Sequence, residues 1–389
     1  MSKDFVIPSA LQICMDDIGW FRGHDMRHIG QPSSTGMPRK HHPLDYKIVN
    51  EVGKAIGMKV MCPLVIGEWD KDNLLRDEIG TTYEPHTWDR ASKIDMTTAQ
   101  KCFEEIENSD YIEFALHGVM HGNYDEKGGQ ITEMEYFGYT SENDKTLKTL
   151  SEEEILRRID IFERVYNSWG FTKKIHSYAA PNGIPSGIDW DDLEPMVKAF
   201  NKKGIKYWTN YWKGKELSVK YLDNILYVIK NNNVMIPWNA YDVDPAYVRD
   251  FLKDEDTHFG TVLGMHWPNF LKFNPENNMQ TLPLWVDYFK RQSEIFGLMI
   301  SKDIAFSCNQ YIYKDLAKTD FVDNKIKIDV APVYEQPSLV PNGEFYISIK
   351  NNKTPVKSNG CTFELYEKHA DFSTYKIKHT DKQMEITVK

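Results

Sequence analysis

The sequence has no hydrophobic run that could cross a membrane and no cysteine pattern that suggests a disulfide framework. No apolar segment reaches the roughly 18 residues of a membrane-spanning helix, and residues 1–10 lack the basic start and apolar core of a secretory signal. The five cysteines are odd in number and widely spaced, as expected for buried thiols in a reducing compartment. We therefore expect a cytoplasmic protein with no membrane partner.

An excess of basic side chains is also missing. Lys and Arg number 47 against 57 Asp and Glu, which gives a net charge of −10 at pH 7. Nucleic acids and anionic membranes attract the opposite sign, so we expect neither as a partner. A small-molecule or oligosaccharide substrate fits better. The 10 Trp and 21 Tyr include candidates for stacking on sugars, although core packing is their ordinary use.

The 389 residues show no internal repeat or low-complexity segment, and the pattern of apolar and turn-forming residues changes once along the chain. Over residues 1–319, short apolar runs alternate with amphipathic stretches, which is typical of a parallel α/β fold. Residues 320–389 alternate as strands between Asn, Gly and Pro turns, which predicts a small all-β appendage. So small a unit has a marginal core, so we expect it to pack on the first domain or on a second copy in a homo-oligomer.

The first part predicts seven strands and several helices. The strands are expected at 10–15, 59–66, 111–115, 174–178, 206–209, 226–229 and 261–265. The helices are expected at 44–56, 97–108, 151–168, 191–203, 245–253 and 282–296. The helix at 151–168 opens on Ser151 with Glu154 three residues later, which is the pattern of a capping box.

Two acids and a glycine end the first strand, in the segment Asp16-Asp17-Ile18-Gly19. In parallel α/β folds ligands gather at the carboxyl ends of the strands, so these carboxylates are expected to face a site. Because successive side chains of a strand point in opposite directions, Asp16 and Asp17 can have different tasks. A helix cap or turn after the strand is the ordinary alternative.

Two histidines follow the third strand with a spacing of four, in His117-Gly118-Val119-Met120-His121. On one turn, two imidazoles at this spacing can bind one divalent ion, although histidines bonded to carbonyls in a loop are about as common. With one carboxylate they form a His-His-Asp site that leaves positions open for water and substrate. The other carboxylate can then act as a base, and His266, at the end of the last strand, can act as an acid.

The order of these motifs resembles the polysaccharide deacetylase superfamily. The resemblance runs from residue 8 to about residue 300 and includes Ala180-Pro181-Asn182-Gly183 between the His-x-x-x-His segment and His266. It implies a distorted (β/α)7 barrel in which a divalent metal ion, Zn²⁺ in particular, assists the attack of water on an N- or O-acetyl group. Carried over, it assigns Asp16 as the general base and His266 as the general acid. Asp17, His117 and His121 then correspond to the metal ligands.

The third motif of the family departs from its usual form. Ala179 stands where the family has an arginine that holds the catalytic acid in its charged form, and Arg22 or His24 could supply that charge. The backbone N–H of Asn182 corresponds to half of the family's oxyanion hole. The fourth motif has no clean match, and Asp242 or Asp244, near Trp238, is a candidate to orient His266.

We expect substrate contacts from residues beside these motifs. They are Trp20, Arg22, His24, Trp238, Asp242 and Trp267. A basic cluster at 39–42 and an aromatic cluster at 208–212 could also roof the pocket or stack on a sugar, but loop structure and helix packing are their more common uses.

The sequence thus predicts a metal-dependent deacetylase, a hydrolase of C–N bonds other than peptide bonds, that acts on a carbohydrate or related small substrate. Two alternatives stay open. A glycoside hydrolase on a related seven-stranded barrel would need a second carboxylate opposite Asp16, such as Asp242 or Asp244. An inactive sugar-binding member would account for Ala179, but Asp16, Asp17, both loop histidines and His266 are all present.

Overall fold

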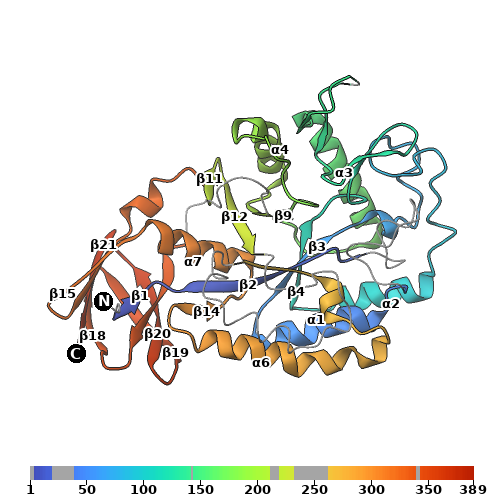
Figure 1. Cartoon of the computed structure of the whole chain (residues 1–389). Coiled ribbons are helices and arrows are strands. Elements are labelled where there is room, and N and C mark those ends of the chain that lie inside the picture. Colours follow the sequence, from blue (N-terminus) through green and yellow to red (C-terminus); the bar gives the residue numbers. More distant parts are fainter. Residues whose placement is uncertain (1–3, 20–38, 142, 211–218, 232–261, 339–341) are drawn as a thin grey trace.

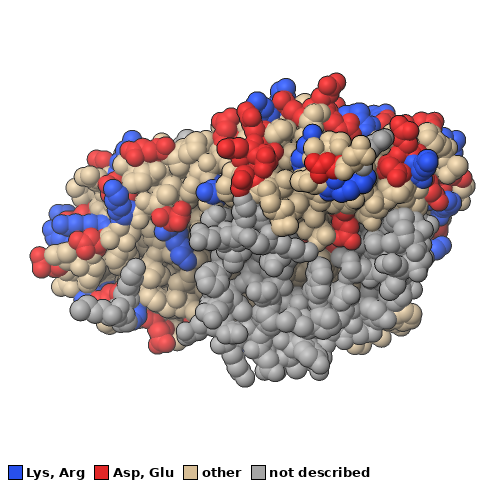
Figure 2. Space-filling view, turned by 45° about the horizontal axis from the view of Figure 1, so that its top comes forward, with Lys and Arg blue, Asp and Glu red and all other residues tan. Residues whose placement is uncertain are grey.

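The structure is a computed structural model of the chain. It describes residues 4–19, 39–141, 143–210, 219–231, 262–338 and 342–389. Among these residues, none of the helices combines the length and the apolar character needed to cross a membrane. Figure 2 shows acidic and basic side chains interspersed over the described part of one face, with no extended field of either sign there.

The central sheet contains seven described strands that lie side by side in the order in which the chain forms them (Figure 1). Every neighbouring pair is parallel. The strands are β2 (Ser9–Asp16), β3 (Val60–Leu64), β4 (Ile112–Leu116), β9 (Ser177–Ala179), β10 (Tyr207–Asn210), β12 (Ile225–Asn231) and β13 (Val262–His266). Two further strands pair with members of this set, β11 (Lys220–Leu222) with β12 and β14 (Leu298–Ile300) with β2.

The strand pairing returns to its starting point, because β13 pairs with β2 as well as with β12. Cys14 on β2 and Thr209 on β10 belong to strands that are not neighbours, yet Cys14 Sγ lies 3.8 Å from Thr209 Oγ1. The side chains of Cys14 and Thr209 therefore point toward each other. The carboxyl ends of parallel strands share one rim, where ligands bind in such folds.

Helices pack against this sheet (Figure 1). They are α1 (Pro43–Ile56), α2 (Met96–Glu107), α3 (Glu152–Trp169), α4 (Glu194–Lys203), α6 (Leu282–Ser293) and α7 (Ile304–Leu316). The start of α3 is as predicted, since Ser151 Oγ accepts the Glu154 N–H at 3.2 Å. The helix ends at Gly170, in the left-handed region at φ 78°, and buries an apolar stripe that includes Ile155 and Phe162.

Short connecting elements follow β3, β4 and β13. The 3₁₀ turn η2 (Gly67–Trp69) follows β3, and the 3₁₀ turn η5 (Trp267–Phe270) follows β13. Two small hairpins follow β4, made of β5 (Asn123–Tyr124), β6 (Gln130–Thr132), β7 (Phe137–Tyr139) and β8 (Leu147–Thr149). The remaining 3₁₀ turns are η3 (Asp191–Leu193), η6 (Pro275–Thr281) and η7 (Ala331–Tyr334).

The chain after α7, together with the N-terminal strand β1 (Phe5–Val6), forms two antiparallel sheets of four strands, in the orders β1-β17-β20-β19 and β15-β16-β21-β18. The strands are β15 (Lys318–Val322), β16 (Lys325–Asp329), β17 (Glu344–Lys350), β18 (Pro355–Asn359), β19 (Cys361–Lys368), β20 (Phe372–His379) and β21 (Gln383–Val388). Both sheets contribute to one apolar cluster, for example through Ile347 and Ile386. The N-terminal strand β1 (Phe5–Val6) pairs with β17, so both ends of the chain lie here (Figure 1).

The predicted α/β class with parallel strands is confirmed. Each of the seven predicted strands has an observed counterpart. Of the predicted helices, the one at 245–253 lies outside the described residues. Helix α7 and the short strands β1, β11 and β14 were not predicted.

Candidate metal centre

Three predicted ligands converge at the carboxyl rim of the sheet. Asp17 follows the last residue of β2, and His117 follows the last residue of β4. His121 lies four residues further on, in the loop that leaves β4. Their side chains offer ligand atoms that all lie within 4.8 Å of one another. The three residues are 1%, 2% and 6% exposed, so they form a buried site that could hold a metal ion.

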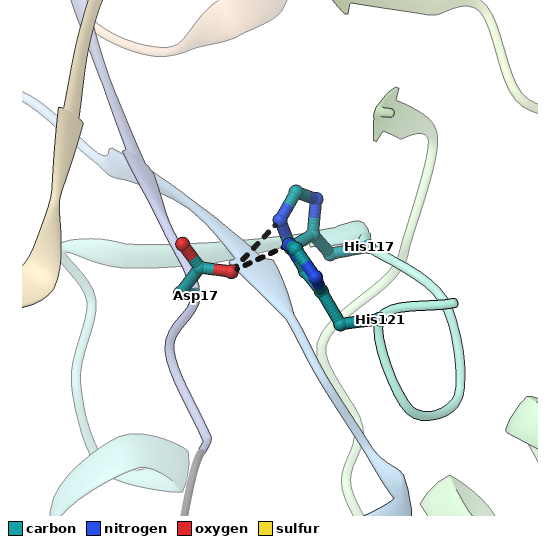
Figure 3. Close-up of side chains that lie close together, drawn as sticks. All are labelled: Asp17, His117 and His121. Atoms are coloured by element: carbon teal, nitrogen blue, oxygen red, sulfur yellow. Dashed lines mark hydrogen bonds and ion pairs between the residues drawn. The ribbon is translucent and has the colours of Figure 1, made fainter. Parts of the chain in front are cut away.

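Both imidazoles approach the same oxygen of Asp17 (Figure 3). The Nε2 atoms of His117 and His121 each lie 3.1 Å from Asp17 Oδ1. Two ligands bound to one zinc ion at about 2.0 Å with tetrahedral angles lie roughly 3.3 Å apart. The observed spacing therefore suits a set of ligands around one ion.

The other nitrogen of His117 has a fixed partner. His117 Nδ1 lies 2.7 Å from the carbonyl oxygen of Ala179, at the end of β9. A carbonyl only accepts hydrogen bonds, so Nδ1 carries the hydrogen and a neutral His117 turns the lone pair of Nε2 toward Asp17 Oδ1. Two acceptors at this distance repel each other unless a cation, either a proton or a metal ion, lies between them. Metal-binding histidines are commonly oriented by such a partner.

The backbone around the site is held in an uncommon conformation. Asp17 and His121 both lie in the left-handed region, at φ 66° and φ 54°, and Gly118 lies at φ 90°. Non-glycine residues adopt this region at a cost, and such residues cluster at functional sites. In this case the turns bring all three side chains onto one point.

The charge state of Asp17 also suits a ligand. Burial raises the pKa of this carboxyl group, but the imidazoles of His121 and His117 outweigh burial and hold the pKa well below its usual range. Asp17 is therefore an anion at neutral pH. One anion and two imidazoles form a ligand set that matches zinc.

Asp16 and His266 lie beside each other on the rim. They are register partners at the ends of β2 and β13. Cys14 Sγ donates to Asp16 Oδ1 at 3.3 Å, so the Asp16 side chain lies on the same side of β2 as Cys14. His266 Nε2 lies 3.3 Å from Asp17 Oδ2, the oxygen that His117 and His121 leave open. His266 therefore lies against the predicted ligand Asp17.

Asn182 and Trp267 take different places. Asn182 is exposed and left-handed, at φ 49°, in the turn that follows β9. Trp267 is fully buried, and its ring centroid lies 5.8 Å from that of Tyr46. Trp267 thus packs against α1, and its contact with a substrate stays a prediction.

Several predicted site residues lie outside the described residues. They are Trp20, Arg22, His24, Trp238, Asp242 and Asp244. Their proposed roles, including that of a carboxylate opposite Asp16, stay predictions.

The two other clusters have structural partners. Arg39 donates from both terminal nitrogens to Asp45, at 2.7 Å each, which anchors the 39–42 segment to α1. Trp208 is fully buried, and its ring contacts Phe200 of α4 at a centroid distance of 5.5 Å. Arg39 and Trp208 thus have the ordinary uses, loop structure and helix packing, whereas Tyr211 and Trp212 of the aromatic cluster lie outside the described residues.

One further residue beside the site was not predicted. Glu135 is fully buried, and its Oε2 accepts the Val119 N–H at 2.6 Å, within the loop between His117 and His121. It belongs to no motif, because its role depends on how the hairpin β5–β6, which separates it from that loop in the sequence, brings the chain back to the loop. The only hint in the sequence is an acid between the apolar residues Met134 and Tyr136.

Comparisons with known proteins give weak similarities. No family model matches the chain, and no curated protein matches it. Among solved structures, the chain is similar to a 4-alpha-glucanotransferase from Thermococcus litoralis with 10% identity and a TM-score of 0.35, over 75% of this chain and 39% of that one. It is also similar to an endogalactoceramidase with 9% identity and a TM-score of 0.26, over 98% and 96% of the two chains. The chain thus spans well under half of the length of the glucanotransferase.

Proposed function

We propose that the protein is a metal-dependent hydrolase that removes an N- or O-acetyl group from a carbohydrate or a related small substrate. The observation that carries the proposal is the approach of two imidazole Nε2 atoms, 3.1 Å each, to one buried oxygen of Asp17. The Nδ1–H of His117 is already committed to Ala179, so its lone pair points at an anion. A metal ion removes this conflict. The order of motifs along the chain favours the deacetylase type on a (β/α)7 barrel.

Asp17, His117 and His121 would hold the ion. When bound, a zinc ion supplies a Lewis acid for the acyl carbonyl and for a water molecule. The three ligands come from two strand ends and one loop, so they leave one side of the site for substrate. Their burial keeps competing water away from the reacting groups.

The remaining residues handle protons. Asp16, buried at the strand end next to Asp17, accepts a proton from water as that water adds to the acetyl carbon. The C–N or C–O bond then breaks, and His266 gives a proton to the departing amine or alcohol. The Asn182 N–H stabilises the oxyanion that forms between these steps. The products are acetate and the deacetylated substrate.

The reaction type is tested by the product that appears. We would incubate zinc-loaded protein with N-acetylglucosamine and its short oligomers and measure both free acetate and new reducing ends. Acetate without new reducing ends supports a deacetylase. New reducing ends without acetate would favour the glycoside hydrolase instead. If neither product forms from any acetylated sugar, ester or amide tested, that result would count against hydrolysis.

A further inference from the structure

A buried carboxylate supports the loop that carries His117 and His121. Glu135 lies just before β7 and is 0% exposed. Its Oε2 accepts the Val119 N–H at 2.6 Å. Val119 is midway between the two histidines, so this hydrogen bond holds the loop at its centre.

The loop and the carboxylate fit tightly together. A Cβ atom on Gly118 would lie 2.0 Å from Glu135 Oε2, which is far below any contact that real atoms make. Gly118 also lies at φ 90°, where side chains are strained. The glycine therefore allows the backbone to wrap directly onto the carboxylate.

Arg158 of α3 extends the same support beyond His121. Its Nη1 donates to the Glu135 carbonyl oxygen, and its Nη2 donates to Asn123 Oδ1, both at 2.8 Å. Asn123 in turn donates to the Phe137 carbonyl oxygen at 2.8 Å. Arg158 is 3% exposed, so these contacts form a buried network under the loop.

Burial of a carboxyl group at the position of Glu135 costs free energy. Glu135 Oε1 is buried and makes no hydrogen bond of ordinary geometry among the described residues, although the Met120 N–H also attracts the carboxylate. Burial raises the pKa of Glu135 to about 7, against the attraction of Arg158 and the Val119 N–H. An apolar side chain of similar size would fill this space at lower cost. We therefore expect the Glu135 carboxylate to have a role that an apolar side chain could not fill.

We propose that Glu135 is a positioning residue, which accepts the Val119 N–H and so fixes the turn that brings His117 and His121 onto one oxygen of Asp17. This role rests on the proposed function, because it assumes that the three residues bind a metal ion. It adds a residue from the segment between β6 and β7 to a site otherwise built on strand ends and the loop after β4.

The test compares three variants of Glu135 in the full-length protein. Glu135→Gln keeps an acceptor for the Val119 N–H, Glu135→Asp withdraws the carboxylate by one methylene, and Glu135→Ala removes it. Zinc affinity is measured by competition with a chromophoric chelator. Hydrogen exchange of the Val119 amide is measured separately in the zinc-free protein. If the alanine variant does not fold, the Gln and Asp pair carries the comparison.

Glu113 provides a matched control. It is also buried, and its Oε1 accepts a backbone N–H, from Ile304, at 2.8 Å. It lies on β4 four residues before His117, and Ile304 begins α7 rather than the metal loop. Glu113→Ala should therefore lower stability without changing zinc affinity.

The proposal expects Glu135→Ala and Glu135→Asp to weaken zinc binding by about 10–100-fold and to expose the Val119 amide to exchange. Glu135→Gln should stay close to the unmodified protein in both measurements. Unchanged zinc affinity in Glu135→Ala, or an equal loss in Glu113→Ala, would overturn it. Absence of zinc binding by the unmodified protein would instead overturn the proposed function. Hydrogen exchange of the Val119 amide would then test whether Glu135 positions the loop, because this exchange is measured without zinc.

Discussion

The Nδ1 atom of His117 lies 2.7 Å from the carbonyl oxygen of Ala179. Ala179 occupies the position where the proposed family, the polysaccharide deacetylases, has an arginine. Its main chain nevertheless takes part in the site, because the carbonyl group fixes which nitrogen of His117 carries the hydrogen. The contact joins the end of β9 to the end of β4, so the His117 ring is oriented by the strand next to its own.

Replacing Asp16 should separate catalysis from metal binding. Asp16→Asn keeps the size of the side chain but removes the base, so acetate release should fall by about 10²–10⁴-fold. Zinc content should not change, because Asp17 and the two histidines are intact. Asp110→Asn, at the exposed opposite end of β4, is the control and should retain full activity. Full turnover by Asp16→Asn would remove Asp16 from the mechanism.

Gly118 should tolerate no side chain. Gly118→Ala adds a Cβ atom 2.0 Å from Glu135 Oε2 to a backbone at φ 90°, so we expect a loss of more than about 2 kcal/mol in the free energy of unfolding. Gly170→Ala is the matched control, since Gly170 has φ 78° and nothing within 4 Å of the added atom. It should lose only about 1 kcal/mol. Equal losses in urea unfolding would contradict the tight fit of the loop on Glu135.

The 39–42 segment should matter for stability rather than for the site. Asp45 is fully buried and accepts from Arg39 twice, from Asn278 and from the His42 N–H. Asp45→Ala removes the charged partner of Arg39, which keeps only backbone carbonyl acceptors, and should cost about 3–5 kcal/mol in urea unfolding. Removing Arg39 as well should recover part of the loss. Zinc content should stay at the unmodified level, and a change in it would mean that this segment belongs to the site.

Glu113 should make stability depend on pH. Burial raises its pKa from 4.5 to about 8 in the folded protein. Between these values the folded protein keeps a proton that the unfolded chain has released, so stability falls as pH rises, by about 1.4 kcal/mol per pH unit. Below pH 4.5 the stability that protonated Glu113 contributes is fully present, and above pH 8 that stability is lost.

Glu113→Gln removes this group without changing its size. The difference in unfolding free energy between the two proteins, measured at several pH values from 5 to 8, should therefore shift steadily in favour of the variant as pH rises. Other titrating groups, including Glu135, are present in both proteins and cancel. Parallel stability curves would show that Glu113 has an ordinary pKa.

The sequence predicted the strand ends well, because hydrophobic runs that stop at charged residues are a local signal. Asp17, His117 and His121 follow such ends directly or by one turn. Helix α7 was missed because its buried face includes Ser307 and Gln310, which interrupt the apolar period. Both side chains donate to backbone carbonyls of the N-terminal segment, Ser307 to Ala10 and Gln310 to Pro8.

The supporting contacts of the site could not be predicted in the same way. The bond from His117 to Ala179 uses a main-chain atom, which has the same chemistry at every residue. Glu135 reaches Val119 across 16 residues of sequence that include the hairpin β5–β6, whose strands are three residues or fewer. Such contacts depend on how the strand ends and loops meet in space, and no spacing rule describes them.

The most direct test of the account is a zinc analysis of the unmodified protein beside His117→Ala. Both are exchanged into metal-free buffer, reloaded with zinc, freed of excess ion and measured by elemental analysis. We predict about one zinc ion per chain in the unmodified protein and a loss of that ion in the variant. No bound zinc in either protein, or equal zinc in both, would contradict a metal centre at Asp17, His117 and His121.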